Sequence, residues 1–359
     1  MHFKLRPLIL LFTLFTLFTL SCSSPSNDIE TYTPKKVDLE IPEIFKKKLI
    51  APIIPETNPL TEEGINLGKK LFFDPILSKN NIQSCAGCHN PKNSFSDIQS
   101  LSEGVNGIKG DRNAMPLFNL AWNFSERFTW SGSELSIERQ VFSPIRNPKE
   151  MHGNWTTIIK KLTTHHEYPN LFLKAFNTTK IDSLLVAKAL AQFQRTLISA
   201  NSKFDNFLEG KTNLSDEELK GFQIFTNENK GDCFHCHGGT QNPLWTDNQF
   251  RNNGLDSEFS DLGLGSVTGD PSDYGKFRTP SLRNLIFTAP YMHDGRFSSI
   301  EEVIDHYSEG LKNSETIDPL MKTVNEGGVH LTNDEKKNLK AFLLTLTDSS
   351  FVNNPNYRN

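Results

Sequence analysis

One five-residue pattern occurs twice in the sequence, as CAGCH at residues 85–89 and as CFHCH at residues 233–237. In each, two cysteines are separated by two residues, and a histidine follows directly. This spacing is specific for covalent attachment of a c-type haem, because both thiols can add to the haem vinyl groups while the adjacent histidine ligates the iron. We therefore predict two c-type haems, with His89 and His237 as iron ligands. The attachment points would be Cys85, Cys88, Cys233 and Cys236.

The four cysteines have two alternative interpretations. A structural zinc site would need all four thiols to converge from two distant segments, and it would leave the histidine after each pair unexplained. Two disulfides are the usual state of paired cysteines in an exported protein. Haem attachment is the interpretation that gives a role to both cysteines and to the final histidine of each pattern.

The bulk composition limits the class of protein. The chain has 359 residues, a length that suits roughly two domains of about 150 residues each. Its residues are 36% hydrophobic, which is enough to form a packed core. The net charge of −4 offers no strongly basic face, so we predict no nucleic-acid partner.

The N-terminus predicts export. Residues 1–22 contain a short basic start and then an apolar run that is too short for a membrane span. The run ends at Cys22, as at the cleavage site of a bacterial lipoprotein. A cleaved signal peptide with an incidental cysteine is the alternative. We expect a periplasmic protein that is lipid-anchored to a bacterial membrane, with a flexible leader over residues 23–58.

Helix signals dominate the rest of the chain, so the predicted fold class is mainly α. Apolar residues at helical spacing, most of them preceded by capping boxes, predict helices over residues 182–197, 215–225, 299–307 and 332–346. Residues 238–280 are rich in Gly, Asp and Asn and predict a long loop. We expect two cytochrome-c-like helical domains, a first haem domain over residues 59–200 and a second over residues 201–350. The last helix is a candidate to pack back on the first domain.

The second axial ligand decides what each haem can do, because a strong ligand makes an electron carrier and an open position admits peroxide or oxygen. For the second haem, the candidates are Met292, His293, His306 and Tyr307. Tyr307 shares the apolar face of its predicted helix, and His306 points about 100° away. A core tyrosine with a hydrogen-bonded hydroxyl is the alternative. The sequence leaves these options open.

The first haem has fewer candidates. Residues 90–150 contain no histidine, and Met115 is their only sulfur. An open position on the iron is therefore expected. A peroxide pocket also needs a group that moves a proton between the two oxygens, and Gln140 and Glu150 could supply it.

Four longer segments resemble the bacterial di-haem cytochrome c peroxidases and their relative MauG. They are GKKLFFDPILSKNNIQSCAGCHNP (68–91), GVNGIKGDRNAMPLFNLAW (104–122), FTWSG with ERQVFSPIRNPKEM (128–132 and 138–151), and FRTPSLRNLIFTAPYMHDG (277–295). The resemblance covers residues 60–347 in order.

The resemblance implies roles for individual residues. Glu150 would be the catalytic acid and base over the first haem, Gln140 its polar neighbour, and Trp130 the aromatic side chain between the haems. Arg283 would lie near the second haem. A calcium ion would be bound at the domain junction by Asn113, Thr288 and Pro290.

Two positions depart from the peroxidase pattern. Many of these peroxidases carry a removable histidine ligand where this chain has Val105, so the first haem should be open even when both irons are ferric. Peroxidases place a methionine where this chain has Tyr307, as in MauG. The resemblance therefore favours Tyr307 as the second-haem ligand, with Met292 the runner-up.

The function implied is reduction of hydrogen peroxide at the first haem, with electrons that enter from a donor such as a small c-type cytochrome and pass through the second haem. A MauG-like oxidase of a protein substrate is the alternative. A di-haem electron carrier without chemistry of its own is the second alternative. The resemblance also implies a homodimer as one candidate assembly.

Overall fold

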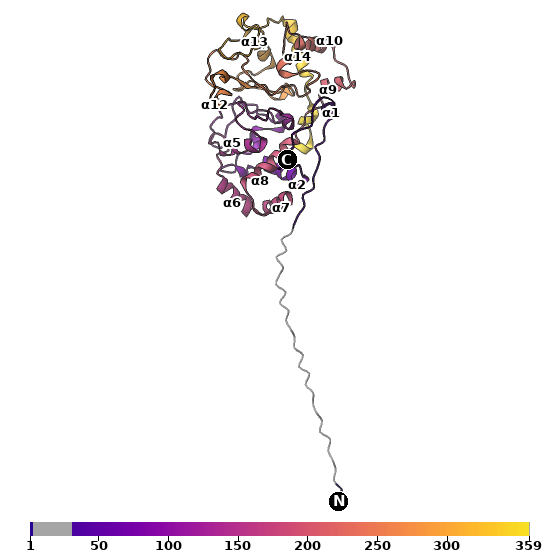
Figure 1. The fold of residues 1–359 in the computed structure, drawn as a ribbon, viewed down its shortest axis with the longest axis vertical. Coiled ribbons are helices and arrows are strands. Elements are labelled where there is room, and N and C mark those ends of the chain that lie inside the picture. Colours follow the sequence, from indigo (N-terminus) through magenta and orange to yellow (C-terminus); the bar gives the residue numbers. More distant parts are fainter. Residues whose placement is uncertain (3–30, 359) are drawn as a thin grey trace. The chain divides into compact units, whose positions relative to one another are not determined.

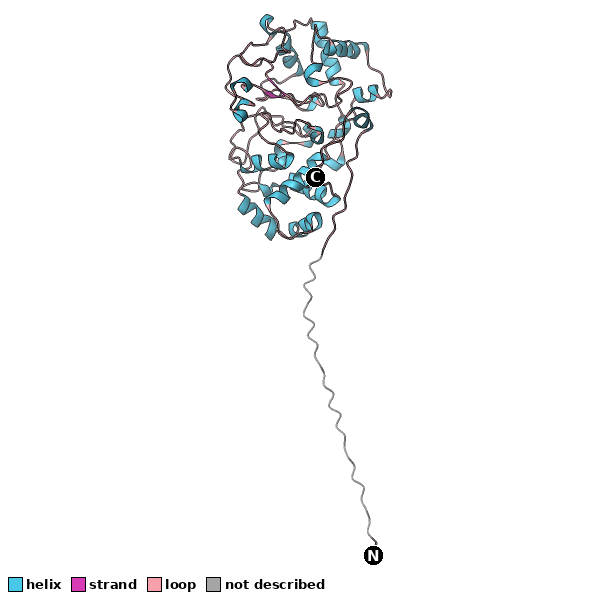
Figure 2. Ribbon diagram, viewed as in Figure 1, coloured by secondary structure: helices cyan, strands magenta, loops and turns pink. Residues whose placement is uncertain are grey.

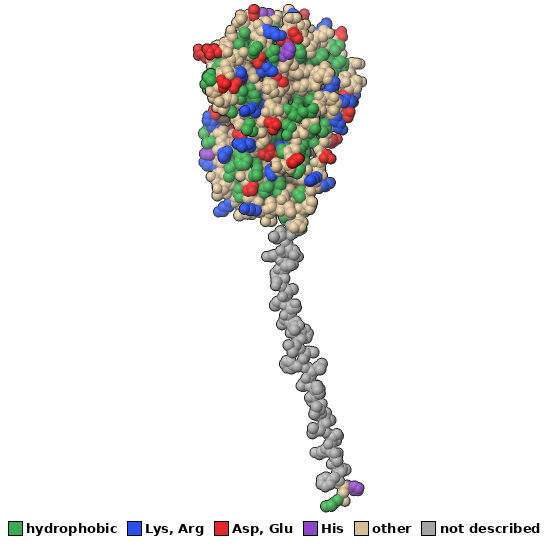
Figure 3. Space-filling view, viewed as in Figure 1, with side chains coloured by type: hydrophobic (Ala, Val, Ile, Leu, Met, Phe, Trp, Pro, Cys, Tyr) green, Lys and Arg blue, Asp and Glu red, His purple; other side chains and the backbone are tan. Residues whose placement is uncertain are grey.

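The computed structural model describes residues 1, 2 and 31–358, of which residues 32–358 form one compact unit (Figure 1). The predicted signal peptide, Cys22 and the first part of the predicted leader lie outside the described residues. None of the described helices has the length and hydropathy of a membrane span. On the face drawn in Figure 3, acidic and basic side chains are interspersed.

The compact unit is mainly helical, which confirms the predicted fold class, and it contains one small sheet (Figure 2). The strands β1 (Phe250–Arg251) and β2 (Phe277–Arg278) pair antiparallel. The α-helices are α1 (Glu43–Lys48), α2 (Glu62–Phe73), α3 (Cys85–Cys88), α4 (Ile137–Gln140), α5 (Phe142–Arg146), α6 (Trp155–Thr164), α7 (Tyr168–Phe176), α8 (Ser183–Arg195), α9 (Lys203–Leu208), α10 (Asp216–Thr226), α11 (Phe234–His237), α12 (Gly265–Thr268), α13 (Ile300–Glu309), α14 (Asn333–Leu344) and α15 (Ser349–Val352).

The four helices predicted from the sequence are α8, α10, α13 and α14. Three of them begin at the predicted capping boxes. In each box, the hydroxyl of the cap residue accepts a hydrogen bond from the backbone N–H three residues later, and the side chain of that later residue accepts one from the backbone N–H of the cap residue. The long stretch between α11 and β2 contains only short elements, as its composition predicts.

The apolar interior falls into two main clusters, one built mostly from residues before 200 and one from residues after it. The first is built from α2, α7 and α8, and the second from α10, α13 and α14 (Figure 1). Rings of Phe204, Phe225, Trp245 and Phe342 pack edge to face or tilted at the centre of the second cluster. We therefore propose the domain boundary near residue 200 that the sequence suggests.

A different helix from the expected one returns to the first cluster. The helix predicted over residues 332–346 is α14, which packs on α10 inside the second cluster. The element that returns is α15, because its Phe351 ring lies 5.7 Å from the ring of Phe95 and 5.8 Å from that of Phe118. The helix α15 therefore packs on the first apolar cluster.

The leader expected over residues 23–58 is ordered where the structure describes it. The short helix α1 buries Ile44 and Phe45, and the ring of Phe45 meets Trp122 at 5.0 Å. Backbone pairing of Val37 with Leu60 holds the preceding segment. The prediction was wrong here because two apolar anchors in a charged stretch are enough to dock a segment that composition alone marks as solvated.

We expect Phe351→Ala to lower the free energy of unfolding by about 3–5 kcal/mol, since it removes a buried ring that no neighbour can replace. Urea unfolding of the haem-loaded protein measures the change. Phe124→Ala, at an exposed ring, is the matched control. Equal losses in the two variants would mean that α15 does not anchor the fold.

Candidate haem sites

The first CxxCH pattern forms the one-turn helix α3, and His89 follows it with its ring turned back toward the chain. His89 Nδ1 donates a hydrogen bond of 3.0 Å to the backbone oxygen of Phe95. That carbonyl reaches the ring because Ser94 and Phe95 both adopt left-handed backbone conformations, with φ of 55° and 60°. The bond fixes the ring orientation and leaves Nε2 as the nitrogen available to a metal.

The second pattern is arranged in the same way with a distant partner. His237 Nδ1 donates to the backbone oxygen of Pro280 over 3.1 Å. Pro280 follows β2, so the long loop must fold back onto α11 to supply this carbonyl. Burial lowers the pKa of His237 to about 4. The ring is therefore neutral at physiological pH, which is the form that binds iron.

All four motif cysteines are free thiols in the structure. Burial is the main cause that raises the pKa of Cys85 and of Cys233 to about 12. Cys85 packs against the first apolar cluster and Cys233 against the second. The four thiols therefore do not converge as a zinc site requires.

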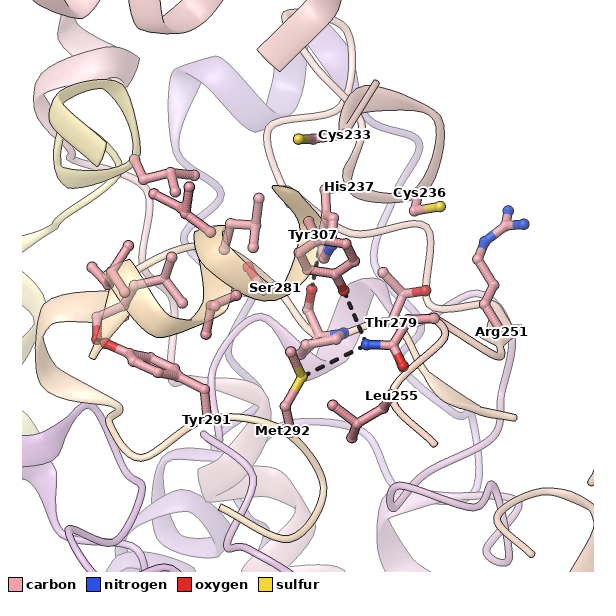
Figure 4. Close-up of a pocket in the computed structure, with 18 of the residues that line it drawn as sticks. Cys233, Cys236, His237, Arg251, Leu255, Thr279, Ser281, Tyr291, Met292 and Tyr307 are labelled. Carbon is pink, nitrogen blue, oxygen red and sulfur yellow. Dashed lines mark hydrogen bonds between the residues drawn. The ribbon is translucent and has the colours of Figure 1, made fainter. Parts of the chain in front are cut away.

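A cavity of about 210 Å³ lies beside the second motif. Its mostly apolar lining includes Cys233, Cys236 and His237 together with Tyr307 and Met292, which come from α13 and the turn before it (Figure 4). An apolar cavity with a thiol pair and a neutral imidazole at its wall is the setting that a c-type haem needs.

One buried cation in this lining fits an anionic ligand. The Arg278 side chain is buried, its Nη2 contacts only the sulfur of Met115 at 3.5 Å, and among the described residues its Nε has no partner. Burial lowers its pKa to about 10. A buried guanidinium without a partner is costly, and a haem carries two carboxylates that could pair with it.

Both candidate ligands of the second haem face the cavity. Asn253 Nδ2 donates to Tyr307 Oη over 3.0 Å and lies 3.6 Å from Met292 Sδ. Burial raises the pKa of Tyr307 to about 12. Of the two histidine candidates, His293 also lines the cavity, where its ring stacks on Phe277, and His306 contacts the backbone oxygen of Asn253.

Glu150 lies beside the first motif, where it contributes to the raised pKa of Cys85 after burial and Cys88. Burial also raises the pKa of Glu150 itself, and a hydrogen bond of 2.7 Å from Asn147 Nδ2 to its Oε1 opposes that shift in part. The Val105 amide donates to the Glu150 backbone oxygen over 2.8 Å. Gln140 is half-buried at the end of α4.

Trp130 and the three residues predicted to hold calcium meet at the same cavity. Trp130 Nε1 donates to the backbone oxygen of Asn113 over 2.9 Å, and the Arg278 amide donates to the Trp130 oxygen. Asn113, Thr288 and Pro290 all belong to the cavity lining. Segments around residues 113 and 288–290, which are far apart in sequence, therefore meet at this cavity.

Arg283 does not line the cavity. Its guanidinium donates to both carboxylate oxygens of Asp205 at 2.6 and 2.7 Å and to the backbone oxygen of Pro243, with no solvent exposure. Burial alone would raise the pKa of Asp205, but the charge and hydrogen bonds of Arg283 lower it. The structure thus places Arg283 in an ion pair with Asp205, between the lining residues Leu282 and Leu285, and its place near the second haem stays a prediction.

Three residues of these sites escaped sequence reasoning: Asn147, Asn253 and Arg278. Arg278 lies in the segment 277–295 that carries the family resemblance, and this resemblance is the signal that could have found it. Asn147 lies three residues before Glu150. Asn253 comes from the long loop, where asparagines are common and no pattern distinguishes this one.

We expect Arg283→Leu to destabilise the protein by about 3–5 kcal/mol at neutral pH, because it leaves the Asp205 carboxylate buried without its partner. Urea unfolding measures the loss, and exposed Arg139→Leu is the control. The visible spectrum of the second haem should stay unchanged. An altered haem spectrum in a stable variant would place Arg283 at the haem instead.

Comparisons with known proteins agree with this arrangement. Residues 62–213 match the family model for di-haem cytochrome c peroxidase. The chain is 37% identical over 297 residues to the methylamine utilization protein MauG of Methylorubrum extorquens, covering 81% of this chain and 80% of the relative. It is 31% identical to the cytochrome c551 peroxidase of Nitrosomonas europaea, covering 83% of each.

A solved structure extends the likeness to the fold. The crystal structure of a MauG-like protein associated with microbial copper homeostasis is 32% identical and superposes with a TM-score of 0.81, covering 90% of this chain and 99% of the other. The resemblance read from the sequence is thus confirmed. The chain belongs to the di-haem cytochrome c peroxidase family, and it is an oxidoreductase that carries two c-type haems.

Proposed function

We propose that this protein reduces hydrogen peroxide at the haem held by Cys85, Cys88 and His89. The observation that carries the proposal is the half-buried Glu150, held by Asn147 beside this motif. When bound, each haem supplies an iron that exchanges electrons, and an iron with an open axial position also binds peroxide.

Glu150 would move the proton. Its carboxylate would accept the proton of one oxygen of the bound peroxide and return it to the other oxygen, which would leave as water when the O–O bond breaks with two electrons drawn from the haems. Because burial raises its pKa, the carboxyl group exchanges protons more readily near neutral pH than an exposed glutamate would. Help of this kind is worth roughly 10²–10⁴-fold in rate. Gln140 would be a polar neighbour of the bound peroxide.

Val105 supports an open first haem. Its amide is fixed to the Glu150 backbone, so the side chain at position 105 belongs to the loop next to the acid. Valine cannot ligate iron, whereas the histidine of many related peroxidases can. We infer that this enzyme reacts with peroxide without a prior reduction step.

Electrons would reach the first haem through Trp130 from a second haem ligated by His237 and Tyr307. Trp130 lines the cavity beside the second motif, and its indole is fixed by Asn113. An anionic oxygen ligand favours ferric iron more than a thioether does. Oxygen atoms of Asn113, Thr288 and Pro290 would hold a calcium ion, which prefers such hard ligands.

A second candidate function is oxidation of a protein substrate. Tyr307 favours it, together with the identity to MauG and to the MauG-like protein associated with copper homeostasis. A simple electron carrier has no use for a half-buried Glu150 beside the first motif. We further propose that the protein is exported to the periplasm and lipid-anchored through Cys22, with a homodimer as candidate assembly.

Replacing Glu150 by Gln should slow the peroxide reaction by roughly 10²-fold or more, because the amide cannot accept the proton. Both haem spectra should stay nearly unchanged. Stopped-flow mixing with peroxide gives the rate. A rate equal to that of the unaltered protein would remove Glu150 from this role.

Asn147→Leu should shift the acid limb of kcat/KM to higher pH. The amide lowers the pKa of Glu150 by bonding to its carboxylate, so its loss raises that pKa, and more alkaline conditions are then needed to ionise the base. A pH profile with peroxide as the varied substrate measures the shift. If the acid limb of the profile does not move, a group other than Glu150 determines its position.

The two candidate functions differ in what is oxidised. We expect multiple turnovers of a reduced small c-type cytochrome with peroxide if the protein is a peroxidase. If the protein instead oxidises a protein substrate, that assay should fail. A co-expressed protein should then show peroxide-dependent modification by mass spectrometry. Trp130→Phe should slow either reaction, since both draw electrons through the second haem.

A further inference from the structure

Two possible iron ligands at the second haem site share a single hydrogen-bond donor. The side-chain amide of Asn253 donates to Tyr307 Oη at 3.0 Å, and the same nitrogen lies 3.6 Å from Met292 Sδ. Figure 4 shows dashed lines that reach both Tyr307 and Met292 from this common point. All three residues line the cavity that also contains His237.

The backbone around Asn253 is fixed from both sides. His306 Nε2 contacts the Asn253 oxygen at 3.3 Å, so the residue next to Tyr307 on α13 holds the main chain that carries the amide. On the other side, the Lys312 amide donates to the oxygen of Gly254 over 2.8 Å. Gly254 has φ of +68°, and a side chain there would press on Lys312 and Ile317. The main chain that carries the side-chain amide of Asn253 is therefore held in place.

Met292 is held in an unfavourable backbone conformation. Its φ is +73°, in a region that costs a non-glycine residue of order 1–3 kcal/mol. The turn that imposes this conformation is closed by pairing of Tyr291 with Phe297. Strain of this kind persists where the surrounding structure enforces it, and here it directs a thioether toward the cavity.

The donor discriminates between the two ligand atoms. An N–H group bonds far more strongly to an anionic oxygen than to a thioether sulfur, which is a weak acceptor. The amide therefore stabilises Tyr307 in the orientation that presents its oxygen to the cavity, and offers Met292 little. Ligand identity then sets which iron oxidation state is favoured, since the oxygen prefers ferric iron and the softer sulfur ferrous iron.

We propose that Asn253 is a positioning residue that selects the oxygen of Tyr307 over the sulfur of Met292 as the ligand of the second haem. The proposal rests on the ligation of that haem by His237 and Tyr307. Met292 is then a reserve ligand, and loss of the Asn253 donor transfers the iron to it.

The test uses Asn253→Asp, nearly equal in size but without the N–H donors, and Asn253→Leu in the haem-loaded protein. Both should lose the tyrosinate-to-iron charge-transfer absorption and gain the low-spin EPR signature of His/Met ligation, and the midpoint potential should shift positive. Asn253→Gln, which keeps the donor, should recover part of the original spectrum. Asn313→Leu, at an exposed asparagine, is the control.

Tyr307→Phe separates the inference from the ligation on which it rests. If Tyr307→Phe leaves the second-haem spectrum unaltered, the proposed ligation is wrong. If Tyr307→Phe alters it while Asn253→Asp and Asn253→Leu do not, the ligation stands and the role of Asn253 is overturned. Adding Met292→Leu to Asn253→Leu should abolish the His/Met signature, and its persistence would exclude Met292 as the reserve ligand.

Discussion

A hydrogen bond from a histidine ring to one backbone carbonyl is the constraint on which both haem sites depend. Phe95 supplies the carbonyl for His89, and Pro280 supplies it for His237. Each bond fixes the ring relative to the thiols that precede it, so the same pentapeptide presents the same nitrogen at both sites. The first bond requires two consecutive residues in left-handed backbone conformations, and the second requires a long loop that folds back.

The two sites are joined by the segment over residues 277–295. It provides the carbonyl of Pro280 to the second site, and its Asn284 side chain donates to Ser94, the neighbour of Phe95, at the first. Asn284 Oδ1 also accepts from the Asp348 amide, which leads into α15. One half-buried segment therefore contacts both sites, directly at His237 and through Ser94 near His89. Trp130 and Asn113 lie at this junction, where electron transfer between the haems would pass.

The sequence was sufficient for features with a local cause. The CxxCH spacing and the capping boxes of α10, α13 and α14 depend on neighbouring residues alone, so the motifs and helices could be predicted. The pairing of Arg283 with Asp205 and the docking of α1 depend on contacts between distant segments. Asn253 was missed for the same reason, because only the folded loop brings its amide to Tyr307. The reserve ligand Met292 is visible in the sequence, but its strained backbone is not.

The central claim is that the haem held by His89 has an iron face that no side chain covers. Electron paramagnetic resonance of the ferric, haem-loaded protein tests it most directly. The account predicts one high-spin signal from this haem beside one low-spin signal from the other, with the high-spin signal lost when peroxide is added. Two low-spin, six-coordinate signals that peroxide leaves unchanged would contradict it.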